Sequence, residues 1–152
     1  MSQKTLSNEE YLFRRLSSTQ YEGNKALRDG FNRRQTERAL SFYLASVVSP
    51  RECLQKNIIS CLNKMNSSNI DERKKAEKRL QTVFGETVEQ AVGKFGWRVA
   101  RIKLSFLESL GCKISDPNHE GHVEVFYNGL QVTLANELAE EAELLSLEDC
   151  LK

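Results

Sequence analysis

The chain has 152 residues, of which 39% are hydrophobic, 28% charged and 8% aromatic. A chain of this length buries one hydrophobic core, so we expect a single domain over residues 1–152. The composition excludes the disordered, collagen-like and disulfide-scaffold classes. There is no secretory signal and no apolar run near the roughly 18 to 20 residues that span a bilayer, so we expect a soluble intracellular protein without a transmembrane anchor.

The formal net charge of +1 hides an uneven distribution of charge along the chain. Residues 1–113 hold 21 Lys and Arg against 12 Asp and Glu, whereas residues 114–152 hold one Lys against nine acidic residues. A basic body could attract nucleic acid or an acidic peptide. The basic residues alternate with acidic and apolar ones, however. This pattern favours basic residues on solvent-exposed faces that the acidic C-terminal segment covers, and not a binding surface.

Four segments before residue 95 have apolar residues at helical spacing, and each predicts a helix. They are residues 8–20, 25–48, 51–65 and 71–92. Pro50 separates the second helix from the third, because proline has no amide hydrogen and the residue before it avoids the α region.

Residues 97–110 predict a central helix, because their apolar residues form two faces of a helix and leave one polar stripe. The first face holds Val99, Ile102, Phe106 and Leu110, the second Trp97, Ala100, Leu104 and Leu107, and the stripe Arg98, Arg101, Ser105 and Glu108. Such a helix is packed on most sides and open along one.

The last segment supports two interpretations. Its leucines fit a helical face from residue 122 onward, and residues 135–147 are helical by composition in either case. Residues 123–127 and 130–134, separated by Asn128 and Gly129, also fit a β-hairpin with a primed turn. Local signals slightly favour the hairpin. We take the helix as the main prediction because of the family resemblance described below, and an α+β fold with a hairpin at 123–134 as the alternative.

Residue patterns typical of catalysis are sparse. His119 and His122 could bind a metal with Cys112, but three ligands without a fourth rarely make a site. There is no glycine-rich phosphate loop and no nucleophile elbow. We therefore expect no enzyme activity, no catalytic residues, no cofactor and no metal.

Two basic clusters could contact nucleic-acid phosphates. One holds Arg33, Arg34 and Arg38, and the other Arg73, Lys74, Lys75, Lys78 and Arg79. Without interleaved aromatic residues or a known reader motif, they would give only non-specific affinity. An exposed helix with charge pairs one turn apart is the simpler interpretation.

The junction of the fourth and fifth predicted helices carries a specific resemblance. Residues 83–100 read VFGETVEQAVGKFGWRVA. This segment resembles the first homology region of the B-cell lymphoma-two (Bcl) family of apoptosis regulators, which leads into that family's central helix. Residues 59–66 are similar to the short survival members of the family. The order here is Phe95-Gly96-Trp97-Arg98, so the family's asparagine is missing, and its glycine and tryptophan have changed places.

The resemblance implies an all-α, Bcl-type helical bundle with a central hydrophobic helix. It implies a small anti-apoptotic protein of the type that large DNA viruses encode, in the cytosol of the host cell or at its mitochondria. Its partners would be the amphipathic Bcl-homology-three helices of pro-apoptotic host proteins, and no nucleic acid. Arg98 would offer a bidentate fork to a ligand carboxylate. The expected groove residues are Leu54, Ile58, Leu62, Met65, Leu80, Val83, Phe84, Val88, Gly96, Trp97, Arg98 and Arg101.

Two other functions remain open on the sequence. One is a nucleic-acid-associated α+β protein that uses residues 25–48 and the segment from residue 71, with strands at 123–134. The other is a homo-oligomeric helical scaffold, for example a homodimer, whose groove is a subunit interface. Strand content distinguishes the first from the helical interpretations.

Overall fold

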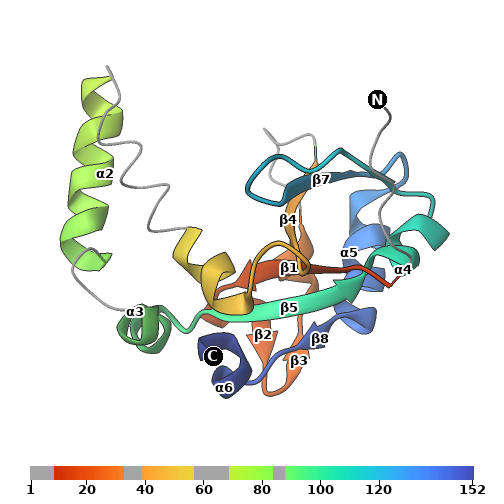
Figure 1. Cartoon of the computed structure of the whole chain (residues 1–152), viewed down its shortest axis with the longest axis horizontal. Coiled ribbons are helices and arrows are strands. Elements are labelled where there is room, and N and C mark those ends of the chain that lie inside the picture. The colour runs from red at the N-terminus through yellow and green to blue at the C-terminus, as the bar shows by residue number, and fades with distance from the viewer. Residues whose placement is uncertain (1–8, 33–38, 57–68, 84–87) are drawn as a thin grey trace.

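The computed structural model describes residues 9–32, 39–56, 69–83 and 88–152. Within these residues, six strands form one antiparallel sheet in the order β6-β7-β4-β1-β5-β8 (Figure 1). The strands are β1 (Tyr11–Leu16), β4 (Leu40–Leu44), β5 (Arg98–Lys103), β6 (Lys113–Ile114), β7 (His122–Phe126) and β8 (Glu143–Leu144). The fold is therefore α+β, and the expectation of an all-α bundle is wrong.

The chain also contains a small hairpin and several helices outside the main sheet. The hairpin pairs β2 (Tyr21–Glu22) with β3 (Lys25–Ala26). The helices are the 3-10 turns η1 (Ser18–Gln20) and η2 (Arg28–Phe31), and α2 (Ile70–Val83), α3 (Val88–Phe95), α4 (Leu104–Ser109), α5 (Gln131–Glu141) and α6 (Leu147–Leu151). Residues 50–56 are also helical. No helix of the described segments is long and apolar enough to cross a bilayer.

The sheet is buried on both faces, and each face has its own core. Because side chains alternate along a strand, Leu12 and Leu16 of β1 point to one face and Phe13 to the other. On the first face, the leucines pack in one cluster with residues of α4 and α5, among them Leu138. On the second face, Phe13 packs with residues of 50–56, α3 and α6, among them Cys150.

The expected central helix at 97–110 is wrong. Arg98 to Lys103 form β5, which pairs with β1 on one side and β8 on the other, and only then does the chain turn into the short helix α4. A strand that is buried on both faces carries apolar residues on both sides, which a helical template interprets as two apolar faces. The β-branched residues Val99 and Ile102 are also well suited to a pleated sheet.

The two expected N-terminal helices are wrong for a similar reason. Residues 8–20 contain β1, and residues 25–48 contain β3, η2 and β4. Buried and half-buried residues alternate along β4, as expected for a strand in a sheet. Leucines at positions 12 and 16 share one face of a strand as readily as one face of a helix, so their spacing does not separate the two structures.

The C-terminal segment agrees with the α+β alternative in containing a strand, but it does not form the expected hairpin. Residues 122–126 form β7, as the α+β alternative expected, so the helix from residue 122 is wrong. The second arm of the hairpin is also wrong, because α5 begins at Gln131. Neither Asn128 nor Gly129 has the positive φ that a primed turn requires, so the tight hairpin turn does not form.

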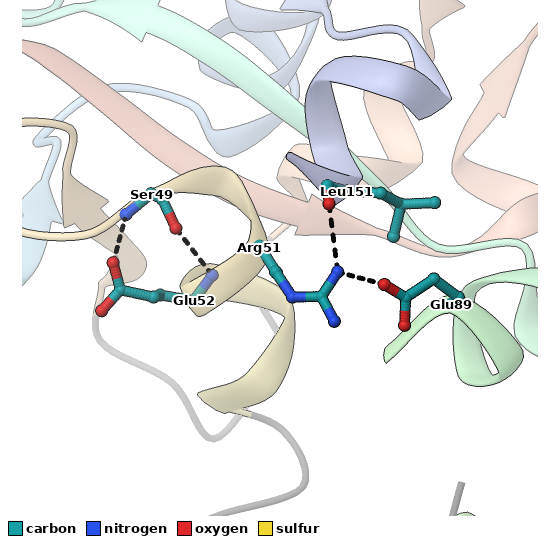
Figure 2. Close-up of polar contacts among 5 residues, drawn as sticks. All are labelled: Ser49, Arg51, Glu52, Glu89 and Leu151. Carbon is teal, nitrogen blue, oxygen red and sulfur yellow. Dashed lines mark hydrogen bonds and ion pairs between the residues drawn. The ribbon is translucent and has the colours of Figure 1, made fainter. Parts of the chain in front are cut away.

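The helix expected at 51–65 agrees with the structure over residues 51–56, whereas the single helix expected at 71–92 corresponds to two helices, α2 and α3, in the described residues. Residues 50–56 open with a capping box (Figure 2): Ser49 N–H donates to Glu52 Oε1 at 3.0 Å, and Glu52 N–H donates to Ser49 Oγ at 3.1 Å. Pro50 thus sits at the start of this helix, where its missing amide hydrogen has no cost. Residues 57–68 and 84–87 lie outside the described residues.

One arginine links the helical elements on the second face. Arg51 donates to the Leu151 carbonyl at 3.0 Å and to the Glu89 carboxylate (Figure 2). The ion pair raises the pKa of Arg51, chiefly through its hydrogen bond to Glu89. Residues 50–56, α3 and α6 are therefore tied together over the sheet.

Candidate nucleic-acid interface

The expected groove residues that the structure describes belong to several different elements. Leu54, Val88 and Trp97 are buried in the second core. Leu80 and Val83 belong to α2, which stands apart from the sheet in Figure 1. Four others, Ile58, Leu62, Met65 and Phe84, lie outside the described residues. The central helix that should have formed the floor of the groove is the strand β5.

Arg98 already uses its fork within the chain. Its Nε and Nη2 donate to the Leu145 carbonyl at 2.8 and 2.6 Å, and its guanidinium lies 5.3 Å from the centre of the Tyr21 ring. These contacts hold the C-terminal segment against β5.

Gly96 ends α3 in the left-handed region. Its φ is +65°, and its N–H donates to the Val92 carbonyl at 2.8 Å. A Cβ here would lie 2.7 Å from Ser18 Cβ, while the Tyr21 hydroxyl donates to the Gly96 carbonyl at 2.9 Å. The glycine expected to admit a partner helix therefore lies against another part of the same chain.

Helix α2, which stands apart from the sheet (Figure 1), carries a concentrated group of positive charges. Its 14 residues, IDERKKAEKRLQTV, include five basic and three acidic residues. Arg73, Lys74, Lys75 and Lys78 are exposed. Lys78 follows Lys75 and Lys74 by three and four residues, so these three side chains share one side of the helix.

The acidic residues of α2 lie mainly at its start. Asp71 and Glu72 are in the first turn, where the positive end of the helix dipole stabilises them. Asn69 Oδ1 accepts a hydrogen bond from Glu72 N–H at 3.1 Å, which makes Asn69 the cap of the helix. The charge of α2 is thus divided along its axis, with the cations beyond the first turn.

A second group of cations surrounds an aromatic ring on the sheet. Tyr11 of β1 lies opposite Lys103 of β5 in the strand register. The Arg101 guanidinium lies 4.7 Å from the centre of the Tyr11 ring, and Lys103 Nζ lies 5.8 Å from it. Arg101 also donates to Glu143 Oε2 at 2.5 Å, which fixes its position.

A hollow of about 370 Å³ opens beside this ring. It is lined by Glu9, Tyr11, Lys103 and Ser105, which bring together a carboxylate, an aromatic ring, an ammonium group and a hydroxyl. We call this set the Tyr11 hollow. It lies where β1 begins and where β5 passes into α4.

A larger hollow of about 560 Å³ lies between β3, η2 and α5. Its charged side chains are of both signs, with Lys25 and Arg28 beside Asp29 and Glu140, and no aromatic side chain lines it. Unlike the Tyr11 hollow, it therefore offers no ring on which a base could stack.

The described cysteines are poorly placed for chemistry. Cys53, Cys112 and Cys150 are free and buried. Burial raises the pKa of the Cys53 thiol to about 12, and it also raises the pKa of Cys112 and Cys150. A thiol with a raised pKa is a weak nucleophile near neutral pH.

His119 and His122, the two histidines considered as metal ligands, lie in different environments. His122 packs edge-on against Tyr43 with ring centres 5.4 Å apart, and the His119 side chain is 89% exposed. Across the described segments, no three His, Cys, Asp or Glu residues gather as a metal site.

The sequence located the cations of α2 but missed the Tyr11 hollow. Tyr11 and Lys103 are far apart in the chain and meet only through the pairing of β1 with β5. The available signal was a period of two, in which Tyr11 alternates with buried Leu12 and Lys103 with buried Ile102.

Comparisons of the chain with protein-family models, with curated proteins and with solved structures find no match.

Proposed function

We propose that the chain is a nucleic-acid-binding α+β protein without enzymatic activity, and that α2 makes its principal contacts to phosphates. The observation that carries the proposal is the exposed group of Arg73, Lys74, Lys75 and Lys78 on a helix that stands away from the sheet. A row of cations on a protruding helix can follow a phosphate backbone without a steric clash with the body of the protein.

The hydropathy of α2 supports this interpretation. A helix that is polar on most of its surface gains little from packing against a core, so its exposed charges need another explanation. The balance of charge in residues 1–113 adds to the attraction for a polyanion. Capture of a Bcl-homology-three helix depended on a central helix at residues 97–110, where the structure has β5 and α4 instead.

The test replaces Lys74, Lys75 and Lys78 together with glutamine. Binding to a fluorescein-labelled oligonucleotide duplex is measured between about 50 and 200 mM salt, because affinity that depends on phosphate contacts falls steeply over this range. We expect weaker binding and a slope of log affinity against log salt that is shallower by about 2 to 3, since each lost phosphate contact removes about 0.9.

The matched control replaces the exposed Lys25, Lys113 and Lys152 with glutamine, which removes the same charge from other surfaces. Circular dichroism establishes that both triple variants are folded. The proposal fails if the unmodified chain does not bind the duplex at about 50 mM salt, where attraction to phosphates is strongest in this range. It also fails if both triple variants lose affinity equally, because the attraction would then depend on overall charge and not on α2.

A further inference from the structure

We infer that the Tyr11 hollow is a stacking site for one unpaired nucleobase, so that the preferred ligand of this chain is single-stranded. This inference rests on the proposed function and narrows it to one class of nucleic acid. Its basis is the juxtaposition of an aromatic ring, two cations and an open hollow at one end of the paired strands β1 and β5.

The first element of the site is a ring held in a fixed position. Tyr11 is half-buried in the sheet, and its backbone is paired with that of Lys103 across β1 and β5. The guanidinium of Arg101, 4.7 Å from the ring centre, is itself anchored by Glu143. A ring fixed in this way loses little conformational entropy when a base stacks against it.

The second element is a buried nitrogen of Arg101. Within the described residues, its Nε is buried and has no hydrogen-bond partner, although its Nη2 is paired with Glu143. Such an atom is costly in a structure that serves only stability. The guanidinium is thus held by Glu143 through Nη2 and lies against the Tyr11 ring without a partner for Nε.

The third element is the chemistry around the ring. Lys103 and Ser105 are exposed at the rim of the hollow, and both can donate a hydrogen bond to a phosphate. A base in the hollow would therefore stack on Tyr11 while its own phosphate lies near Lys103. Stacking on an aromatic ring tolerates any base, because every base has a π face.

The strand state of the ligand follows from the position of the ring. In a duplex, each base is stacked between its neighbours, so its faces are not available to a ring set into a sheet. Only an unpaired base can enter the Tyr11 hollow without the cost of flipping out of a helix. The exposed cations of α2, by contrast, can bind the phosphates of either form.

The experiment compares Tyr11→Leu with Tyr11→Phe. The probes are a fluorescein-labelled mixed-sequence DNA strand of roughly 12 nucleotides, within the site sizes of single-strand binders, and the same strand annealed to its complement. We expect Tyr11→Leu to weaken single-strand binding by about five-fold or more, and Tyr11→Phe, which keeps the ring, by less than about two-fold. Duplex binding should change in neither variant.

Photo-crosslinking gives a second measurement on the unsubstituted chain. A single strand that carries 5-iodouracil should crosslink at Tyr11, as located by mass spectrometry of the digested complex. A crosslink found only at other residues would overturn the stacking site, even if Tyr11→Leu does not fold.

The possible failures are distinguishable. If the unsubstituted chain binds neither probe, both the proposed function and the stacking site are overturned. If it binds both probes equally and Tyr11→Leu binds the single strand as well as the unsubstituted chain does, the stacking site is overturned and the function proposed for α2 stands.

Discussion

The role of Arg98 gives a direct test of the fold. In the structure, its Nε and Nη2 donate to the Leu145 carbonyl at 2.8 and 2.6 Å, and its guanidinium lies 5.3 Å from the centre of the Tyr21 ring. We expect Arg98→Met, which keeps much of the side-chain volume but no donor, to weaken the attachment of the C-terminal segment to β5. An Arg98 that waited for a ligand carboxylate would instead be replaceable without loss of stability.

The size of the effect follows from these contacts. Hydrogen bonds from a charged donor contribute about 1.5 to 3 kcal/mol, and the lower end applies because both bonds share one acceptor at a half-buried site. The cation–π contact adds about 0.5 to 1 kcal/mol. Together they predict a loss of about 2 kcal/mol, which for a chain of this size lowers the Tm by about 4 to 8 °C.

Differential scanning calorimetry measures the shift in Tm, and hydrogen exchange locates its origin. The amides of Val99 and Cys150 should exchange faster in Arg98→Met, because α6 is held less firmly against β5. Arg28→Met makes the same substitution at an exposed position and is the control. The reasoning is refuted if the Tm of Arg98→Met stays within about 1 °C of the unsubstituted chain, well inside the shift that such a loss of stability requires.

The remaining predictions concern backbone conformation and a buried thiol. Gly96→Ala should lower the free energy of unfolding by at least about 1 kcal/mol in urea titration, since φ is +65° and a Cβ would lie 2.7 Å from Ser18 Cβ. Gly93→Ala, in α3 with no atom within 4 Å of the added Cβ, should raise it by about 0.5 to 1 kcal/mol; a destabilised Gly93→Ala would contradict the packing. Cys53, with its pKa raised from 9.0 to about 12, stabilises the fold fully below pH 9 and progressively less as the pH rises toward 12. Urea titrations across this range should therefore show a steeper fall for the unsubstituted chain than for Cys53→Ala. Parallel curves would refute the raised pKa, because the thiol would then ionise at the same pH in the folded and the unfolded chain.

The elements that sequence periodicity predicted are those that depend on nearby residues. Helix α2 begins beside the cap Asn69, and its residues are strong helix formers, so its local preference and its structure agree. The helix at 50–56 likewise carries its own capping box. In each case, the residues that decide the structure are a few positions apart.

The strands were missed because their partners are distant in sequence. The apolar pattern of residues 97–110 fits a helix that is packed on two faces, and only the pairing of β5 with β1 and β8 shows it to be a strand between two cores. The hairpin at 123–134 failed in another way. Its first strand formed, but Asn128 and Gly129 led the chain into α5, which buries Leu134 and Leu138 in the first core. Tertiary burial overrode a local turn signal there.

The candidate site likewise combines a part that depends on nearby residues with a part that depends on distant ones. The cations of α2 are consecutive or nearly so, and their grouping was visible in the sequence. The Tyr11 hollow joins residues at one end of the pairing between β1 and β5, two strands that are far apart in the sequence, so no short-range pattern could reveal it. Only its alternation of polar and buried residues was available as a signal.

The order of the strands has a consequence for biogenesis. Among the described residues, β1 precedes the other strands in the sequence and is central in the sheet, and its longest pairing is with β5, which is synthesised much later. Neither core can form until β5 has emerged from the ribosome, because both cores contain residues of β5. Apolar segments such as residues 11–16 therefore remain exposed in the nascent polypeptide until then. Non-local pairing of this kind slows folding and prolongs exposure to aggregation, so production of this protein should benefit from slower translation or from chaperones that shield its N-terminal portion.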